Sequence, residues 1–178
     1  VTAHIREEVL CREALALELI RLGASVDAHD TDGYTPLHWA SLNGYEQVGM
    51  VLVRRQADVN ATSNAGITPL LQAAARGHLG VVRLLIERKA RVNRAAADGS
   101  TALLKAVANG HWEVINALLD AGASTDATMQ NGATLVDIAA RAKDARIRER
   151  IAIAARMEAR GDAPIQRDEP PPFTGTMY

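Results

Sequence analysis

A short phrase that begins with glycine returns along this chain at a constant interval of 33 residues. It reads Gly-Tyr-Thr-Pro-Leu-His from Gly33, and altered copies begin at Gly66, Gly99 and Gly132. Two further landmarks keep the same interval: a glycine followed by Tyr or His, and a group of the form Ala-x-Val-Asp or Ala-x-Val-Asn. A constant period of this length indicates an array of stacked units rather than a globule around one core.

Each full unit is expected to hold two short helices. The first helix follows a threonine whose hydroxyl can cap the first turn, and proline occupies its first position in two units. These helices should begin near residues 35, 68, 101 and 134. Left-handed glycines should end three of them: Gly44, Gly77 and Gly110. The second helices carry an apolar stripe at i, i+3, i+4 spacing, and turn-like or hairpin loops connect the units.

The two ends of the array depart from the repeat. An amphipathic helix is predicted from Arg6 to Leu22 in the position of a second helix, and the first helix of that unit is missing or degenerate. Seven basic and three acidic residues between Arg141 and Arg160 predict a polar capping helix. After Gly161 the composition shifts to Asp, Glu and Pro, which favours an extended tail. The predicted segments are 1–29 (half unit), 30–62, 63–95, 96–128, 129–160 (cap) and 161–178 (tail).

The repeat length and the phrase Gly-x-Thr-Pro-Leu-His-x-Ala resemble the ankyrin repeat over roughly residues 7–160. The resemblance implies an all-α fold, in which antiparallel helix pairs stack into a curved solenoid with short β-hairpin fingers along one edge. It also implies binding to other proteins, since ankyrin arrays are rarely catalytic. The histidine of the phrase, His38, is replaced by Leu71, Leu104 and Asp137 in later units. The resemblance therefore supports the loop-bracing hydrogen bonds of this histidine in the first full unit only.

Two residues stand where other units have a left-handed glycine after the second helix. Gln56 and Lys89 occupy the positions that Gly23 and Gly122 take in their own units. A side chain in this conformation costs about 1 kcal/mol. Replacing either residue by glycine is therefore predicted to stabilise the array.

Composition limits the class of partner. The net charge is -1, with acidic and basic residues interspersed, so nucleic acid is not an expected partner. No apolar run of about 18 residues and no signal-peptide pattern is present, and the single cysteine cannot form an intrachain disulfide. An intracellular location without membrane insertion is therefore expected. Because the first residue is Val1 rather than Met, we also expect the chain to be a piece of a longer polypeptide.

No catalytic, metal-binding or cofactor-binding motif is recognised. His78 and His111 are one unit apart, roughly 8 to 10 Å, which is too far to share a metal ion. No Cys-x-x-Cys, His-Glu-x-x-His or phosphate-binding glycine loop occurs. We interpret these two histidines and His38 as hydrogen-bonding groups of loops and helix ends. The sequence predicts no enzyme and no cofactor.

The resemblance places partner binding on the concave face, which the first helices and the fingertips form. Because interface hot spots favour Tyr, Trp and Arg, the cluster of Tyr34, Trp39 and Tyr45 predicts a binding centre on the first two full units. Trp39 has a second interpretation, which we favour, as a core residue between helices, and Tyr34 could equally be merely exposed. The predicted partner-binding residues are Tyr34, Trp39, Leu42, Asn43, Asn64, Ile67, Gln72, Arg76, Lys105 and Asn109.

Two functions agree with these patterns. The first is a non-catalytic protein–protein interaction module that binds a partner polypeptide on its concave face. The alternative is a constitutive structural subunit of a large multi-protein assembly, held through its ends, its convex face and its tail. The sequence does not identify the partner, because the residues that select it are those that the repeat leaves free to vary.

Overall fold

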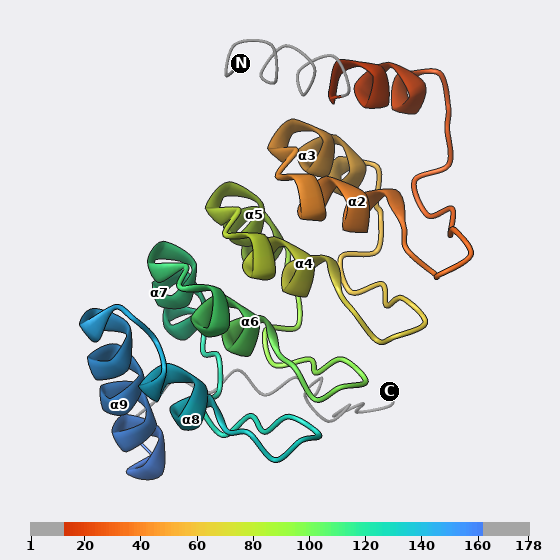
Figure 1. Ribbon diagram of the computed structural model, residues 1–178. Helices are drawn as coiled ribbons and strands as arrows, with labels where there is room; N and C mark the ends of the chain where they lie inside the picture. Colours follow the sequence, from red (N-terminus) through yellow and green to blue (C-terminus); the bar gives the residue numbers. More distant parts are fainter. Residues whose placement is uncertain (1–12, 162–178) are drawn as a thin grey trace, which may run out of the picture.

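A computed structural model describes residues 13–161 of the chain, and Figure 1 shows that its helix pairs stack in chain order. A first helix, described over residues 13–21, precedes the pairs. The eight helices that follow among the described residues are α2 (Pro36–Asn43), α3 (Glu46–Arg54), α4 (Pro69–Arg76), α5 (Leu79–Glu87), α6 (Ala102–Asn109), α7 (Trp112–Asp120), α8 (Leu135–Ala140) and α9 (Ala145–Ala159). The expected all-α repeat solenoid is confirmed.

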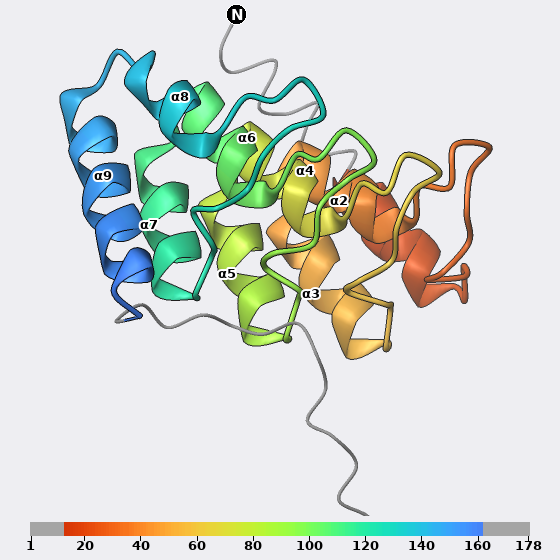
Figure 2. The ribbon, with the colours of Figure 1, turned by 90° about the horizontal axis from the view of Figure 1, so that it is seen from below.

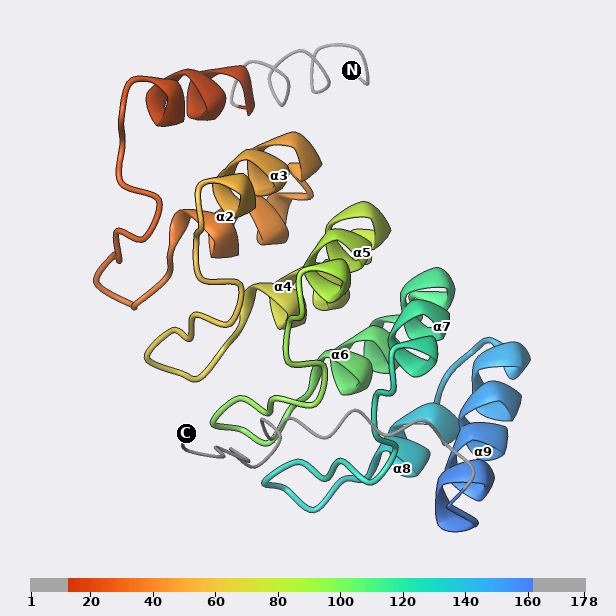
Figure 3. The same ribbon diagram turned by 180° about the vertical axis from the view of Figure 1, so that it is seen from behind.

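The helices form two layers. Figure 2 shows α2, α4, α6 and α8 side by side in one row, the inner layer, with α3, α5, α7 and α9 in a second row, the outer layer. Seen from behind in Figure 3, the loops between the pairs project from the same edge of the stack, next to the inner layer. We call these loops the fingers. Each full unit thus contributes one inner helix, one outer helix and one finger.

Threonine caps define where the inner helices begin. Thr68 and Thr101 accept a hydrogen bond from the backbone amide three residues later, and Thr134 does the same for Asp137. Pro36 and Pro69 occupy the first helical positions. The inner helices therefore start one residue after each predicted threonine, and Gly44, Gly77 and Gly110 end three of them with φ near +75°.

Backbone hydrogen bonds join each finger to the next. Within the fingers, the amides of Asp30, Ser63, Ala96 and Met129 each donate to the carbonyl four residues later, at 2.9 to 3.0 Å. Between fingers, Asn64 N donates to Asp32 O, Ala97 N to Ala65 O and Gln130 N to Asp98 O, at 2.9 to 3.0 Å. The same bonds therefore recur at 33-residue spacing and stack the fingers edge to edge.

The core follows the repeat in both layers. Leu37, Leu70 and Leu103 of the inner helices and Leu52, Leu85 and Leu118 of the outer helices are at most 1 % exposed. Small residues lie between the inner helices: Ala73, Ala74 and Ala106 are completely buried. Because alanine lets helix backbones approach closely, the inner helices pack into a continuous row.

Gln56 and Lys89 adopt the left-handed conformation that the sequence predicted for them, with φ of 65° and 64°. Gly23 and Gly122, at the corresponding positions, have φ of 96° and 84°. The register of the outer helices is thereby confirmed.

The two ends differ from the interior units as expected. Residues 6–12 of the predicted first helix lie outside the described residues, as do residues 162–178 of the predicted tail. At the other end, α9 buries Ile147, Ile151 and Ala154 on one side. Two of its arginines form ion pairs: Arg146 pairs with Asp144 of the cap at 2.7 Å, and Arg150 with Asp120 of the preceding unit at 3.2 Å.

Candidate partner-binding site

Histidines at the start of two outer helices fasten each unit to the one before it. His78 Nε2 lies 3.1 Å from Leu42 O, and His111 Nε2 lies 3.1 Å from Ala75 O. Since a carbonyl can only accept, the imidazole nitrogen is the donor in both cases. The hydrogen-bonding interpretation of these two histidines is confirmed.

His38 braces the first full unit against the second finger. Its Nδ1 accepts from Thr35 N at 3.1 Å and lies 2.9 Å from Thr35 Oγ1, so the proton resides on Nε2, which donates to Ile67 O at 2.9 Å. Burial of the ring lowers the pKa of His38, against the smaller opposite effect of the bond to Ile67. The imidazole is therefore held neutral, as the bond from Thr35 N requires.

In the next unit, leucine replaces this histidine and a hollow opens. The first full unit fills the space with two rings, because Tyr34 packs edge-on against His38 with centroids 5.4 Å apart. One unit later, Ile67 and Leu71 take these positions. Beside them lies a cavity of about 220 Å³, which we call the finger hollow; Ile67 is smaller than Tyr34, whereas Leu71 is about as large as His38 and lacks its ring nitrogens. Its lining is Ala65, Ile67, Leu71, Ala96, Ala97, Asp98, Ser100 and Lys105.

An ion pair borders the finger hollow. Lys105 Nζ lies 3.3 Å from Asp98 Oδ2, and Asp98 Oδ1 accepts from the hydroxyl and the amide of Ser100. The hydroxyl bond from Ser100 is the main cause that lowers the pKa of Asp98, with a further contribution from Lys105. The apolar lining of the hollow suits an apolar side chain of a binding partner, and the ion pair at its rim suits polar residues next to that side chain in the partner's sequence.

The structure does not bring the predicted site residues together in one place. Ile67 and Lys105 line the finger hollow. On α4, Gln72 is half-buried and Arg76 is exposed. Asn64 and Asn109 are exposed, but their side-chain amides already donate to Thr31 O and Ala75 O of the preceding units. Tyr34 and Leu42 are half-buried. Trp39 and Asn43 lie away from the finger hollow, on the side of α2 that faces the N-terminal helix.

The interpretation of Trp39 as a core residue is wrong. The side chain is 49 % exposed and lines a groove beside the N-terminal helix, where no inner helix of the described residues 13–161 covers it. Its indole Nε1 donates to Asp30 Oδ2 at 3.1 Å. By contrast, Trp112 is half-buried and packs against the core, with the Arg146 guanidinium 5.1 Å from its ring centroid.

Family comparisons agree with this architecture. Residues 9–96 match a model described as ankyrin repeats (3 copies), and residues 98–130 match a second model described as ankyrin repeat. The chain belongs to the ankyrin repeat family. Ankyrin repeats generally act as protein–protein interaction modules and are typically non-enzymatic. No curated protein sequence matched this chain.

Other properties of this ankyrin array concern its described residues alone. Within residues 13–161, no helix is both long enough and apolar enough to cross a membrane. The same part of the chain contains no group of three or more His, Cys, Asp or Glu side chains placed to hold a metal ion.

Sequence reasoning missed the alanines of the finger hollow. Ala65, Ala96 and Ala97 carry no chemical signal of their own, and their importance comes from the space they leave unfilled. A usable signal did exist, since Leu71 was recognised as a departure from the histidine of the repeat. The effect of Leu71 depends also on Ile67, which is smaller than Tyr34 at the same position of the repeat. No sequence motif records that difference in size.

Proposed function

We propose that this ankyrin array binds a partner polypeptide on the face made by its fingers and inner helices. In this proposal one apolar side chain of the partner enters the finger hollow. The observation that carries the proposal is the hollow itself, a mostly apolar cavity between two fingers, bordered by the Asp98–Lys105 ion pair. Burial of one apolar side chain there contributes about 1.5 to 3 kcal/mol to binding.

The surroundings of the finger hollow favour an acidic partner segment. Arg76 and Arg94 are exposed, and no ion pair joins either of them to another described residue. Lys105 is half-buried at the rim and is already paired with Asp98. Arg94 comes two residues before Ala96 of the hollow and Arg76 ends α4, which carries Leu71 of the hollow, so we expect a partner motif that combines one large apolar residue with Asp or Glu.

The test is a selection from a displayed library of random peptides on the immobilised chain, followed by affinity measurements on variants. Filling the hollow with Ala97→Phe should weaken the selected peptides at least about tenfold, and Arg76→Ala about threefold. Arg83→Ala, on the exposed side of α5 in the outer layer, is the matched control and should leave affinity unchanged. Equal binding to all three variants would refute this site.

A second function, as a structural subunit of an assembly, is favoured by apolar residues exposed at both ends. Leu15 and Leu22 are 59 % and 69 % exposed at the N-terminal end, and Val136 and Ile153 are 50 % and 44 % exposed at the other. Cross-linking in cells separates the two functions. Cross-links concentrated at the ends would favour an assembly, and cross-links around the finger hollow would favour the interaction module.

A further inference from the structure

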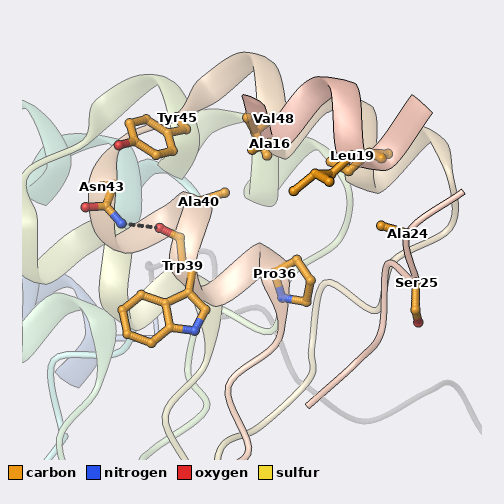
Figure 4. Close-up of a pocket in the computed structure, with 11 residues that line it drawn as sticks. Ala16, Leu19, Ala24, Ser25, Pro36, Trp39, Ala40, Asn43, Tyr45 and Val48 are labelled. Atoms are coloured by element: carbon orange, nitrogen blue, oxygen red, sulfur yellow. Dashed lines mark hydrogen bonds between the residues drawn. The ribbon is translucent and has the colours of Figure 1, made fainter. Parts of the chain in front are cut away.

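The N-terminal end of the array contains a second, larger apolar depression. It lies between the helix at 13–21 and α2 and has a volume of about 240 Å³ (Figure 4). We call it the end groove. Its lining is Ala16, Leu19, Ile20, Ala24, Ser25, Pro36, Trp39, Ala40, Asn43, Tyr45 and Val48. Leu19 and Trp39 are each about half exposed there, at 50 % and 49 %.

Within the described residues, the end groove is an inner-helix position that no helix occupies. The helix at 13–21 lies 33 residues before α3 and is therefore the outer helix of its unit. The side of α2 that lines the groove carries Pro36, Trp39, Ala40 and Asn43. The corresponding residues of α4 are Pro69, Gln72, Ala73 and Arg76, and α4 packs directly on α2. A helix in the groove would thus contact α2 as α2 contacts α4.

Two hydrogen-bond donors at one end of the groove match the pair that fastens inner helices elsewhere. In the third full unit, Asn109 Nδ2 and His111 Nε2 both donate to Ala75 O, at 2.9 and 3.1 Å. Asn43 and Tyr45 occupy the same positions of the repeat, and Figure 4 shows them together at one end of the groove. Asn43 Nδ2 donates to Trp39 O of its own helix at 2.8 Å. By repeat position, both side chains correspond to the donors that bond the last-turn carbonyl of the preceding inner helix, and Asn43 would exchange its bond to Trp39 O for one to the incoming helix.

The interior units also define how that helix must end. The rings of His78 and His111 lie against Gly44 and Gly77, where an added Cβ would come within 2.6 Å of the imidazole. Tyr45 stands at the same position of the repeat with a larger ring. The occupant of the end groove therefore needs glycine directly after its helix.

The segments of this chain that could reach the groove do not have this pattern. Residues 3–10 fall in the register of α2, yet they place His4 and Glu7 at the positions of Leu37 and Ala40, which are 0 % and 2 % exposed. The last unit of a second copy carries Lys143 where earlier units have the glycine. In the segment 162–178, the eight residues before Gly175 include Pro170, Pro171 and Pro172, which do not match the sequence pattern of α2. Since none of these segments of the given sequence has the pattern, we assign the groove to a helix of a partner protein.

Charge at the edge of the groove selects the residues before the helix. Asp30 accepts from Trp39 Nε1, Tyr34 N and Asp32 N, and the bond from Tyr34 N is the main cause that lowers the pKa of this carboxyl. The neighbouring Asp27 and Asp32 are exposed in the same finger. Since successive fingers stack edge to edge, the loop before an incoming helix would lie against these carboxylates. A basic residue in that loop is electrostatically favoured.

We propose that the end groove binds a two-turn helix of a partner protein, with a small side chain facing Ala40, a glycine after the last turn and a basic residue before the first. This site is independent of the finger hollow, which lies two units away along the stack. The occupant would take the inner-helix position that residues 13–161 leave open.

The probe for this site is a synthetic peptide with the sequence of residues 62–77 of this chain, which contains a finger, α4 and its terminal glycine. A hydrocarbon staple replaces Gln72 and Arg76, the face that α4 turns toward α2, so the staple will point away from the groove. The protein is the full chain with Trp112→Phe, which leaves Trp39 as its only tryptophan. Binding should shift Trp39 emission to shorter wavelength in a saturable titration, because the helix removes the indole from water.

Matched variants separate the contributions. Asn43→Ala and Tyr45→Phe should each weaken binding about three- to tenfold, as loss of one hydrogen bond predicts. Leu19→Glu should weaken it more, whereas Lys105→Ala at the finger hollow should leave it unchanged. A peptide with lysine in place of its terminal glycine should not bind, and one with lysine in place of Asn64 should bind more tightly at low salt. Circular dichroism of each protein variant verifies that it is folded.

Several results would overturn the proposal. One is the absence of a Trp39 shift at millimolar peptide, and another is undiminished binding to folded Leu19→Glu. Self-association of the chain that Leu19→Glu abolishes would assign the groove to a second copy. Binding that requires removal of residues 1–12 would assign it to the chain's own N-terminal segment. None of these results bears on the peptides selected through the finger hollow, so failure of one site leaves the other testable.

Discussion

The two ends of this array solve the same problem differently. At the C-terminal end, α9 has 15 residues, against nine in α3, α5 and α7, and side chains tie it to the unit before. Glu158 accepts from Ser124 Oγ, Thr125 N and Thr125 Oγ1 at 2.5 to 2.7 Å. At the N-terminal end, by contrast, the ion pair that the structure describes for the helix at 13–21 lies within that helix, between Arg21 and Glu18, and does not join it to the next unit.

Burial differs in the same way. Ile147 and Ile151 of α9 are 1 % exposed, whereas Leu15, Leu19 and Leu22 at the other end are half or more exposed. The comparison teaches that a stack of repeats has unpaired contact positions at both of its ends, because the terminal units lack a neighbour on one side. At the C-terminal end, the carboxylate of Glu158 bonds the polar groups of Ser124 and Thr125. The part of the first unit that the structure describes leaves an inner-helix position open, and this position is the end groove.

Matched leucine and isoleucine truncations should give the largest effect. We expect Ile151→Ala to cost about 2 to 5 kcal/mol, because it opens a cavity beneath α9, and Leu19→Ala to cost about 1 kcal/mol or less. Urea unfolding followed by tryptophan fluorescence measures both, with Trp112 near the C-terminal end and Trp39 near the N-terminal end. Equal losses would show that the two ends are equally well packed.

Removing the charge of Glu158 should have an intermediate effect that depends on pH. Burial raises the pKa of this carboxyl, but the bonds from Ser124 and Thr125 together outweigh it, so the pKa lies below its ordinary value. The carboxylate therefore stabilises the fold at pH values above its unfolded pKa, and this contribution is lost as the pH falls through the folded pKa. We expect Glu158→Gln to cost about 1 to 3 kcal/mol at pH 7 and much less near pH 3.

The control for this measurement is Glu149→Gln, because Glu149 is exposed on the same helix. Urea midpoints at pH 7 and pH 3 for the wild type and both variants give the comparison. A difference between Glu158→Gln and the wild type that is independent of pH would show that the three hydrogen bonds do not require the charge.

The smallest effects are expected where the interior units carry strain. Gln56→Gly and Lys89→Gly should each raise stability by up to about 1 kcal/mol, because glycine relieves the positive φ at both positions. Higher urea midpoints at both tryptophan probes would show that the gain spreads through the stack. Unchanged or lower urea midpoints for both variants would show that the positive φ of Gln56 and Lys89 does not destabilise the fold.

The sequence predicted most of the fold because each element is repeated. Threonine caps, terminal glycines and the left-handed Gln56 and Lys89 all follow from local backbone chemistry, which a motif records directly. Trp39 was interpreted wrongly because burial in a stack depends on the neighbouring unit rather than on the residue. The finger hollow and the end groove could not be predicted from the sequence for the same reason, since each is an unfilled space between side chains of two neighbouring units.

The bonds between fingers have a consequence for how such a chain can change in length. Each one joins a backbone amide to a backbone carbonyl, so it survives whatever side chains the two fingers carry. Duplication or loss of 33 residues between the ends would recreate the same edge on both sides of the junction. Growth by whole units therefore preserves the backbone ladder of the fingers, whereas an insertion within a finger that shifts these amides and carbonyls would interrupt it.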